Sequence, residues 1–270
     1  MQEGFPLAWA AAFLYVVYGV LILRSLRNSK AVAGRGLLYG ATLALVLHAV
    51  CLTKGIFGNG AVTFGFGLAA SAALWAASFV IIVESAIRRV TVLMGFVLLL
   101  SAPACPFPEI FPGFVISTDA SFAFKAHLAF AFLAYGFTID AAVQAVLITA
   151  MSRKIRHPIG DVDKGWLANM PDLMAMERIF FRIIVCAFLS VTGVLFFGAW
   201  VTSEYWHVII GFDHKTILTW ISWIVFAVLL VGRFRFGWRG KTALTWFWVA
   251  AAALVIAYLV YRLLIELSMG

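Results

Sequence analysis

Long uninterrupted apolar runs are the feature of this sequence that most constrains its fold. Runs of roughly 18 to 25 apolar residues can cross a hydrocarbon core about 30 Å thick as α-helices. Eight apolar runs cover residues 6–23, 36–53, 62–83, 90–106, 122–150, 179–201, 215–232 and 242–265. They are continuous rather than alternating, which argues against the strands of a membrane barrel. The fourth run is short, because Pro103, Pro106 and Pro108 end it early.

Composition agrees with a chain that is embedded in a membrane. Hydrophobic residues make up 64% of the 270 residues and charged residues only 12%, whereas soluble domains are about one quarter charged. No internal repeat or low-complexity tract divides the sequence. We therefore predict an all-α integral membrane protein with about eight transmembrane helices, forming a single domain over residues 1–270.

Basic residues alternate between the connections and predict the topology. The connections after the first, third, fifth and seventh runs hold Arg24, Arg27, Lys30, Arg35, Arg88, Arg89, Arg153, Lys154, Arg156, Lys164, Arg233, Arg235, Arg239 and Lys241. The other connections hold little more than Lys54, Lys125 and Lys215. Because basic loops stay in the cytoplasm, we expect both termini outside. The net charge of +8 then reflects topology and attraction to anionic membrane lipid, and it does not indicate a nucleic-acid partner.

The longest polar stretch, residues 157–178, is cytoplasmic in this topology. Pro171 and Asp172 open a helical pattern that continues through Glu177 and Arg178, as is typical of a helix start. We interpret this second half as a short surface helix that leads into the sixth span and has a structural role.

Histidine placement is the most informative functional signal. His48 lies near the outer end of the second run and His127 near the outer end of the fifth. His207 and His214 lie in the outer connection before the seventh run, and His157 alone lies inside. A single intramembrane histidine can hydrogen-bond a neighbouring helix, but several at one level are typical of a ligand site or proton path. Imidazole is also a common metal ligand.

A bare zinc site does not fit the remaining ligand types. The chain has no HExxH and no paired CxxC motif, and zinc needs three or four ligands at recognisable spacing. Cys51, Cys105 and Cys186 are isolated in the sequence. Cys51 and Cys105 could pair in an oxidising compartment, but we expect buried free thiols.

Haem b fits the histidines better than a bare metal ion. Two histidines from different helices can bind haem iron, and His127 with His214 is the preferred pair, with His48 an additional candidate. Aromatic residues gather near the outer ends of the sixth and seventh runs, namely Trp200, Tyr205, Trp206, Phe212, Trp220 and Trp223. Trp206 and Trp220 are candidates for the wall of a haem crevice, although an interfacial aromatic belt also places tryptophan there.

Two charged residues flank His214 at the start of the seventh run. Lys215 could pair with a haem propionate, helped by the positive end of the helix. Asp213 is suited to cap that helix or to orient a ligand histidine through its second nitrogen.

Three segments together resemble a known family. FKAHLAFAFLAYGFTIDAAVQA, MPDLMAMERIFFRIIVCAFLSVTGVLFFGAW and FDHKTILTWISWIVFAVLLVGRF closely resemble the cytochrome c assembly superfamily of CcsA, CcmC and HemX-like proteins, nearest to its shorter YpjD/HemX-like branch. The resemblance extends over nearly the whole chain. It implies a multi-pass protein of the bacterial inner membrane that holds or presents haem at the outer face, in CcsA for covalent attachment to apocytochrome c.

The resemblance also assigns positions. His127 matches a histidine that ligates haem in the longer members, and Asp213 to Thr216 occupy the place of their tryptophan-rich WDPKET element. His48 sits where a membrane histidine recurs in this branch. The chain departs from CcsA at Val231, where CcsA has a histidine, and no histidine follows the eighth run. His214 would then replace the missing ligand, or another pairing would be used.

Two classes of function follow, and a third is retained. The first is a haem-binding assembly factor, rather than a stand-alone enzyme, with apocytochrome c or other cytochrome c assembly subunits as partners. The second is a HemX-like regulatory membrane protein that acts on haem biosynthesis without transferring haem. The third is a small-ion or proton carrier that uses Asp140 in the middle of the fifth run. For Asp140 itself we expect hydrogen bonds to neighbouring tyrosine or threonine.

The basic connections generate a direct prediction about topology. Reporter fusions at Met1 and at Gly270 should both report an outer location, because the basic loops remain in the cytoplasm. Reporters active only inside the cell at both ends would overturn the side assignment, and with it the outer placement of the histidines.

Overall fold

The computed structural model describes residues 5–27, 35–57, 62–87, 92–117, 121–156, 170–206 and 214–269. In this part of the chain, eight helical segments are long and apolar enough to cross a membrane. The prediction of an all-α membrane protein with eight spans is therefore confirmed. The elements are α1 (Phe5–Arg27), α2 (Arg35–Phe57), β1 (Val62–Phe64), α3 (Phe66–Ile87), α4 (Val92–Ser101), η1 (Ala102–Ala104), α5 (Phe107–Ile110), β2 (Phe114–Ser117), α6 (Phe122–Arg156), α7 (Leu173–Trp206), α8 (His214–Phe236), α9 (Gly240–Val255), η2 (Ile256–Val260) and α10 (Tyr261–Met269).

A small sheet was missed by the sequence analysis. The first residues of the third apolar run form β1 rather than helix, and β1 pairs antiparallel with β2. The register places Phe64 opposite Phe114. The missed strands are only three and four residues long, too short to give an alternating pattern that can be distinguished from a helix end.

The fourth span is interrupted where the prolines predicted it would be. α4 ends at Ser101, the 3₁₀ turn η1 contains Pro103, and the short α5 follows with Pro106 as its N-cap. Proline lacks the backbone N–H that a continuing helix needs. Together these pieces form one candidate span, Val92–Ile110.

The separate surface helix expected before the sixth span is not present. α7 is one continuous helix of 34 residues that begins at Leu173, so Glu177 and Arg178 belong to the first turns of the span itself. The sequence prediction was wrong because charged residues were taken to mark an exposed helix. Glu177 is instead buried, with 8% of its surface exposed.

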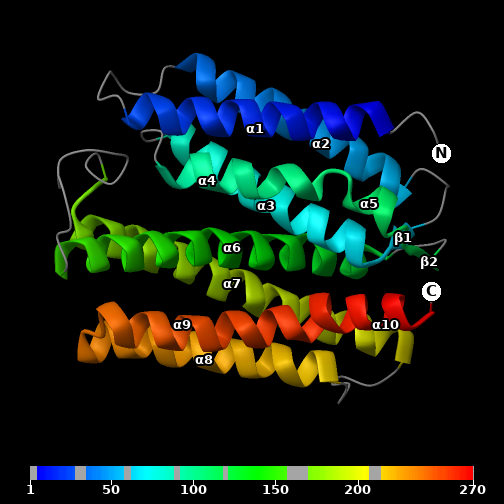
Figure 1. Cartoon of the computed structure of the whole chain (residues 1–270). Helices are drawn as coiled ribbons and strands as arrows, with labels where there is room; N and C mark the ends of the chain where they lie inside the picture. The colour runs from blue at the N-terminus through cyan, green and yellow to red at the C-terminus, as the bar shows by residue number, and fades with distance from the viewer. Residues whose placement is uncertain are drawn as a thin grey trace.

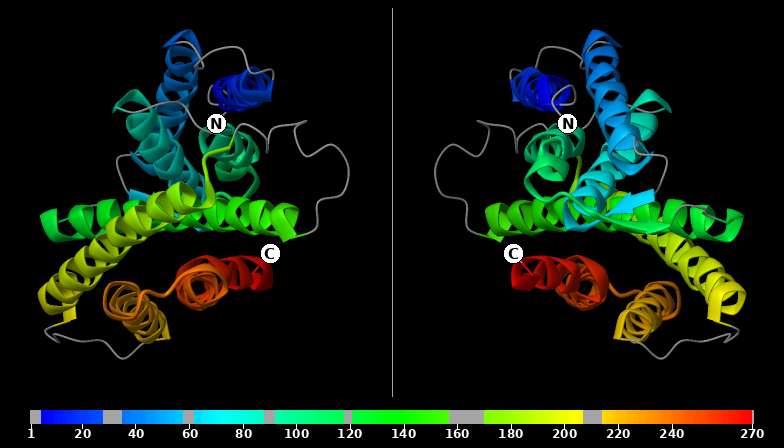
Figure 2. Two further views of the ribbon diagram at one scale, coloured as in Figure 1. Left: turned by 90° about the vertical axis from the view of Figure 1, so that its left-hand side faces the viewer. Right: turned by 90° about the vertical axis from the view of Figure 1, so that its right-hand side faces the viewer.

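The long helices α6 and α7 occupy the middle of the molecule. In Figure 1 and in both end views of Figure 2, they lie between the α1–α4 layer and the hairpin of α8 with α9 and α10. α6 is the longest element, at 35 residues, and it packs against α3, α4, α7 and α9.

Small residues allow α3 and α6 to approach closely. A Cβ atom added at Gly136 would lie 2.8 Å from the backbone nitrogen of Ala77 and 2.9 Å from the backbone carbon of Ala76. α3 buries further small residues, Ala69, Ala70, Ala72 and Ala73. Small residues of this kind are typical of helix contacts in membranes, where lipid tails are as apolar as leucine and close packing drives association.

Basic residues collect at one end of the bundle. Arg24 and Arg27 end α1, Arg153, Lys154 and Arg156 end α6, and Arg233 and Arg235 end α8. α1 begins and α10 ends at the opposite end (Figure 1). The two ends are thus distinguished by charge, as the sequence predicted, and their assignment to the two sides of the membrane stays a prediction.

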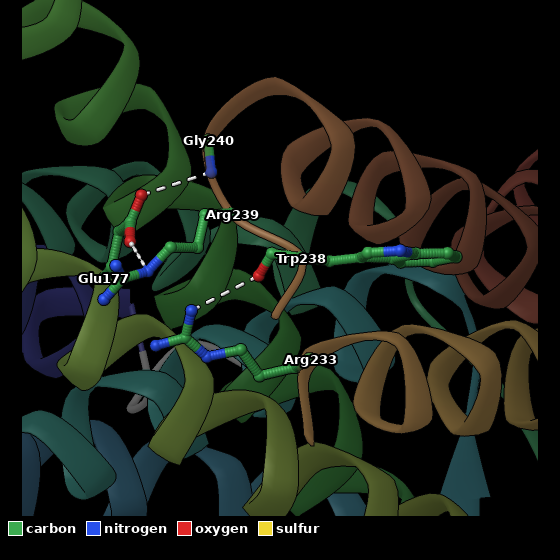
Figure 3. Close-up of polar contacts among 5 residues, drawn as sticks. All are labelled: Glu177, Arg233, Trp238, Arg239 and Gly240. Carbon is green, nitrogen blue, oxygen red and sulfur yellow. Dashed lines mark hydrogen bonds and ion pairs between the residues drawn. The ribbon is translucent and has the colours of Figure 1, made fainter. Parts of the chain in front are cut away.

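The turn between α8 and α9 is fastened to α7 through Glu177 (Figure 3). One Glu177 carboxylate oxygen accepts a hydrogen bond from the Gly240 backbone N–H at 3.2 Å, and the other lies 3.4 Å from Arg239 Nε. Arg233 donates to the Trp238 carbonyl at 3.3 Å. A buried acid therefore ties together the turn and the start of α7, and we call this set of contacts the Glu177 clamp.

Glycine is required in this turn because its backbone is left-handed at two positions. Gly237 has φ 67° and Gly240 has φ 54°. A left-handed backbone costs other L-residues about 1–2 kcal/mol.

We expect Gly240→Ala to lower the free energy of unfolding by about 1 kcal/mol or more. A Cβ atom there would meet no other atom within 4 Å, so the loss isolates backbone strain. Gly36→Ala is the matched control, because Gly36 also has open space but lies in helix α2, where alanine is favoured. Denaturant titrations in mixed micelles would measure both variants. Equal effects of the two substitutions would contradict the strain argument.

Candidate functional site

A cleft of about 340 Å³ lies among α6, α7, α8 and the C-terminal helical segments. This volume is at the lower end of the roughly 300–1,000 Å³ typical of small-molecule and cofactor sites. We call it the His127 cleft. Its lining residues are Phe64, Ala69, Phe124, His127, Leu128, Ala131, Phe132, Ala134, Tyr135, Val194, Leu195, Gly198, Ala199, Val201, Thr202, Lys215, Thr216, Thr219, Trp220, Leu254, Ala257 and Tyr258.

His127 presents an imidazole whose tautomer is set by its surroundings. Its Nδ1 lies 3.1 Å from the Val194 carbonyl oxygen of α7. A carbonyl can only accept, so Nδ1 carries the proton in this contact and Nε2 keeps its lone pair. A backbone carbonyl on one ring nitrogen is a common way to orient a histidine that binds metal through the other.

Gly198 leaves space for the His127 ring to pack against α7. A Cβ atom at Gly198 would lie 3.2 Å from Cε1 and 3.3 Å from Nδ1 of His127. A larger residue at this position would press on the ring edge that bonds to Val194. α7 therefore fixes the imidazole both by a hydrogen bond and by close packing.

Lys215 places a positive charge at the cleft near two aromatic rings. Its Nζ lies 5.8 Å from the centroid of the Tyr258 ring and 5.5 Å from that of Tyr261. Distances within about 6 Å are those of cation–π contacts. Lys215 is the second residue of α8, where the N–H groups at the helix start add to the positive potential.

Trp220 lines the same cleft from α8, one turn beyond Thr216. It also packs edge to face with Trp223, with ring centroids 5.7 Å apart. The structure thus brings together three of the sequence-predicted site residues, His127, Lys215 and Trp220.

His214 lies next to this group but not on the lining of the cleft. It is the exposed first residue of α8, and its ring centroid lies 3.8 Å from that of Tyr261. It directly precedes Lys215 in the chain, but its imidazole packs on α10.

His48 is placed in a different part of the molecule. It is fully buried in α2, with Nε2 2.8 Å from the Ser71 hydroxyl and Nδ1 3.4 Å from the Tyr15 hydroxyl. Both ring nitrogens therefore have partners, on α3 and on α1. Ser78 and Ser101 form a further hydroxyl pair at 2.8 Å between α3 and α4.

Two predicted site positions cannot be located in the same way. Asp213 lies outside the described residues. Trp206 ends α7, but its side chain falls outside the described part of the chain. The structure therefore does not place either side chain relative to the cleft.

Several residues of the cleft were not predicted from the sequence. Phe132 and Tyr135 extend the His127 face of α6, and Tyr258 comes from η2. Tyr135 donates to the Leu254 carbonyl at 2.9 Å, which joins α6 to α9. Helical spacing from His127 to Ala131 and Tyr135 could have identified the α6 face. Tyr258 gave no such signal, because it lies in a π-helical turn that breaks the regular period.

Eight spans and a cleft with one oriented histidine define a multi-pass membrane protein with a candidate cofactor site. The sequence profile described as "Cytochrome C assembly protein" matches residues 35–268, and the chain belongs to this family. It is also 26% identical over 269 residues to the inner membrane protein YpjD of Escherichia coli strain K12, covering 96% of this chain and 98% of that protein. The protein of the same name in Escherichia coli O157:H7 gives the same identity and coverage. No solved structure matches the chain significantly.

The His48 contacts generate a prediction about stability. Ser71→Ala should lower the free energy of unfolding by about 1 kcal/mol or more, because it leaves a buried imidazole nitrogen without its partner. Ser190→Ala is the matched control, since Ser190 is also buried but bonds only to the Cys186 carbonyl of its own helix at 2.9 Å. That local bond contributes little to stability. A Ser190 effect as large as the Ser71 effect would contradict the cross-linking role of His48.

Proposed function

We propose that this protein is a haem-binding protein of the inner membrane, of cytochrome c biogenesis type, that holds haem b in the His127 cleft at the outer face. The observation that carries the proposal is His127, whose imidazole lines the cleft with Nδ1 committed to Val194 and Nε2 kept as a possible ligand atom. Neutral imidazole is a standard axial ligand of haem iron.

The other lining residues suit the remaining parts of a haem. Phe132, Tyr135 and Trp220 supply aromatic surface for a macrocycle, and Lys215 supplies a positive charge for a propionate. His214 is the second ligand in this proposal because it adjoins Lys215, and it must leave Tyr261 to reach the iron. We assign His48 no part in ligation, because both of its nitrogens are engaged elsewhere.

Membership of the family supports cytochrome c assembly as the setting. The related YpjD proteins are named for the inner membrane, which supports the same location here. Presented haem would pass to apocytochrome c or to another cytochrome c assembly subunit. Either partner would dock at the end of the bundle that holds the His127 cleft.

Absorption spectra of protein purified after haem-replete expression test this proposal. His127→Ala should lower haem occupancy by about tenfold or more, because it removes the ligand that the protein orients. His214→Ala should convert a six-coordinate spectrum into a five-coordinate one. Lys215→Ala should speed haem loss without changing the ligand set, because it removes only the charge opposite a propionate.

Two controls separate ligation from general damage. His157→Ala should leave the spectrum unchanged, since His157 belongs to the connection at the other end of the bundle. Added imidazole should restore haem binding to His127→Gly, which a merely misfolded variant would not allow. Absence of haem from the wild-type protein, or equal spectra for all variants, would reject the haem site and favour the regulatory function.

A further inference from the structure

A second cavity, of about 330 Å³, lies at the end of the bundle where the basic residues collect. It is enclosed by residues of α3, α4, α6 and α7 and by Met170 and Pro171 before α7. Most of its lining is apolar, and its polar side chains are Glu84, Ser85, Gln144 and Arg182. We call it the Glu84 cavity. A space of this size has room for several water molecules, and these four side chains can hydrogen-bond to them.

Asp140 is a buried acid close to this cavity. It is fully buried in α6, and neither carboxylate oxygen has a hydrogen-bond partner among the described residues. Tyrosine or threonine partners were predicted from the sequence, and that prediction was wrong. Thr138 instead donates to the Ala134 carbonyl of its own helix, and Tyr135 to Leu254. A lone carboxylate in apolar surroundings is very costly unless it takes up a proton or a cation.

The packing of α3 on α6 places Asp140 next to the Glu84 cavity. The two helices run in the same direction (Figure 1), and Gly136 contacts α3 at Ala76 and Ala77. One turn further along α6, Asp140 lies at the level of Ile81, which lines the cavity. Another turn brings Gln144 to the level of Glu84.

The helices that pack against α6 carry the other charged and titratable groups of this region. α3 contributes Glu84, which pairs with Arg182 of α7 at 3.7 Å. α7 also carries Cys186, one turn from Arg182, and, near its start, Glu177 and Arg178. The Glu177 carboxylate is held by Gly240 and Arg239. α4 has no titratable residue in its sequence, and α9 has only Lys241, which is exposed near its start. Among these helices, Glu84 is the group suited to relay a proton to Asp140.

We propose that Asp140 is a proton-binding site of this protein, loaded through water in the Glu84 cavity. A hydronium ion in the cavity, or a transiently protonated Glu84, loses a proton and the Asp140 carboxylate gains it, so that one O–H bond breaks and one forms. The pair of Glu84 with Arg182 places two charged side chains in the lining of the cavity. The ligand is a single proton, and the site is separate from the His127 cleft.

Infrared spectroscopy of the full-length protein in lipid nanodiscs tests this site. The wild type should show the carbonyl stretch of a protonated carboxylic acid, and this band should shift on transfer to D₂O. Asp140→Asn should lose the band, whereas Glu109→Gln should keep it, because Glu109 is exposed at the other end of the fourth span. Ser85→Leu, which adds apolar volume to the cavity lining, should slow the shift in D₂O.

The outcomes separate this site from its alternatives and from the haem site. Loss of the wild-type band on adding sodium or potassium would overturn the proposal in favour of a cation site. An identical band in Asp140→Asn, or exchange unaffected by Ser85→Leu, would also overturn it. If Asp140→Asn does not fold, Glu84→Gln provides the test, because it should move the Asp140 band. Haem spectra should be the same in all these variants, so that failure here is distinct from failure of the haem proposal.

Discussion

The close contact of α3 with α6 is the interaction on which the rest of the structure depends. Within a bilayer no hydrophobic force drives two helices together, so close packing of small residues must supply the attraction. Gly136 on Ala76 and Ala77 supplies it here. This contact joins the N-terminal helices to the C-terminal ones through a single long helix. That helix carries His127 near one end and Asp140 at its middle, about 20 Å apart at 1.5 Å per residue.

Three polar side chains within the membrane spans differ in how many hydrogen bonds the protein gives them: the buried His48 and Asp140 and the partly buried His127. His48 has both ring nitrogens paired, so its cost of burial is offset within the bundle. His127 has one nitrogen paired with Val194. Asp140 has no hydrogen-bond partner in the described part of the chain. A polar side chain to which the protein gives fewer hydrogen bonds has more capacity left for a ligand. The number of hydrogen bonds therefore distinguishes His48, His127 and Asp140, which sequence position alone does not.

The sequence predicted the spans well because their signal is local. Continuous apolar length determines a membrane helix almost independently of its neighbours, and the prolines after Ser101 ended α4 as expected. Glu177 was misjudged for the opposite reason, because its partners Arg239 and Gly240 lie far along the chain. The pairing of β1 with β2 likewise connects segments that no local pattern relates.

The residues of the candidate site were predicted only in part, because the prediction lacked the three-dimensional packing of the helices. Sequence position gives the depth of a residue along a span, but it does not tell which face of the bundle that residue occupies. His48 and His127 were thus assigned to one level, yet they face different sets of helices. Lys215 and His214 show the same limit at shorter range, since adjacent residues of one helix point in different directions. Only the packing of α7 and α10 decided which of them lines the cleft.

The Glu177 clamp has a mechanical consequence for the opposite end of α8. The clamp fastens the α8–α9 turn at the basic end, and α8 extends from there over 23 residues, or about 35 Å, to Lys215 and the cleft. A rigid rod held at one end turns a small angular change into a large displacement at the other. A tilt of about 5° at the clamp would carry the start of α8 through about 3 Å, on the length given by the helical rise. A change at the Glu177 carboxylate that tilted α8 would therefore alter the width of the cleft at the far end of the bundle.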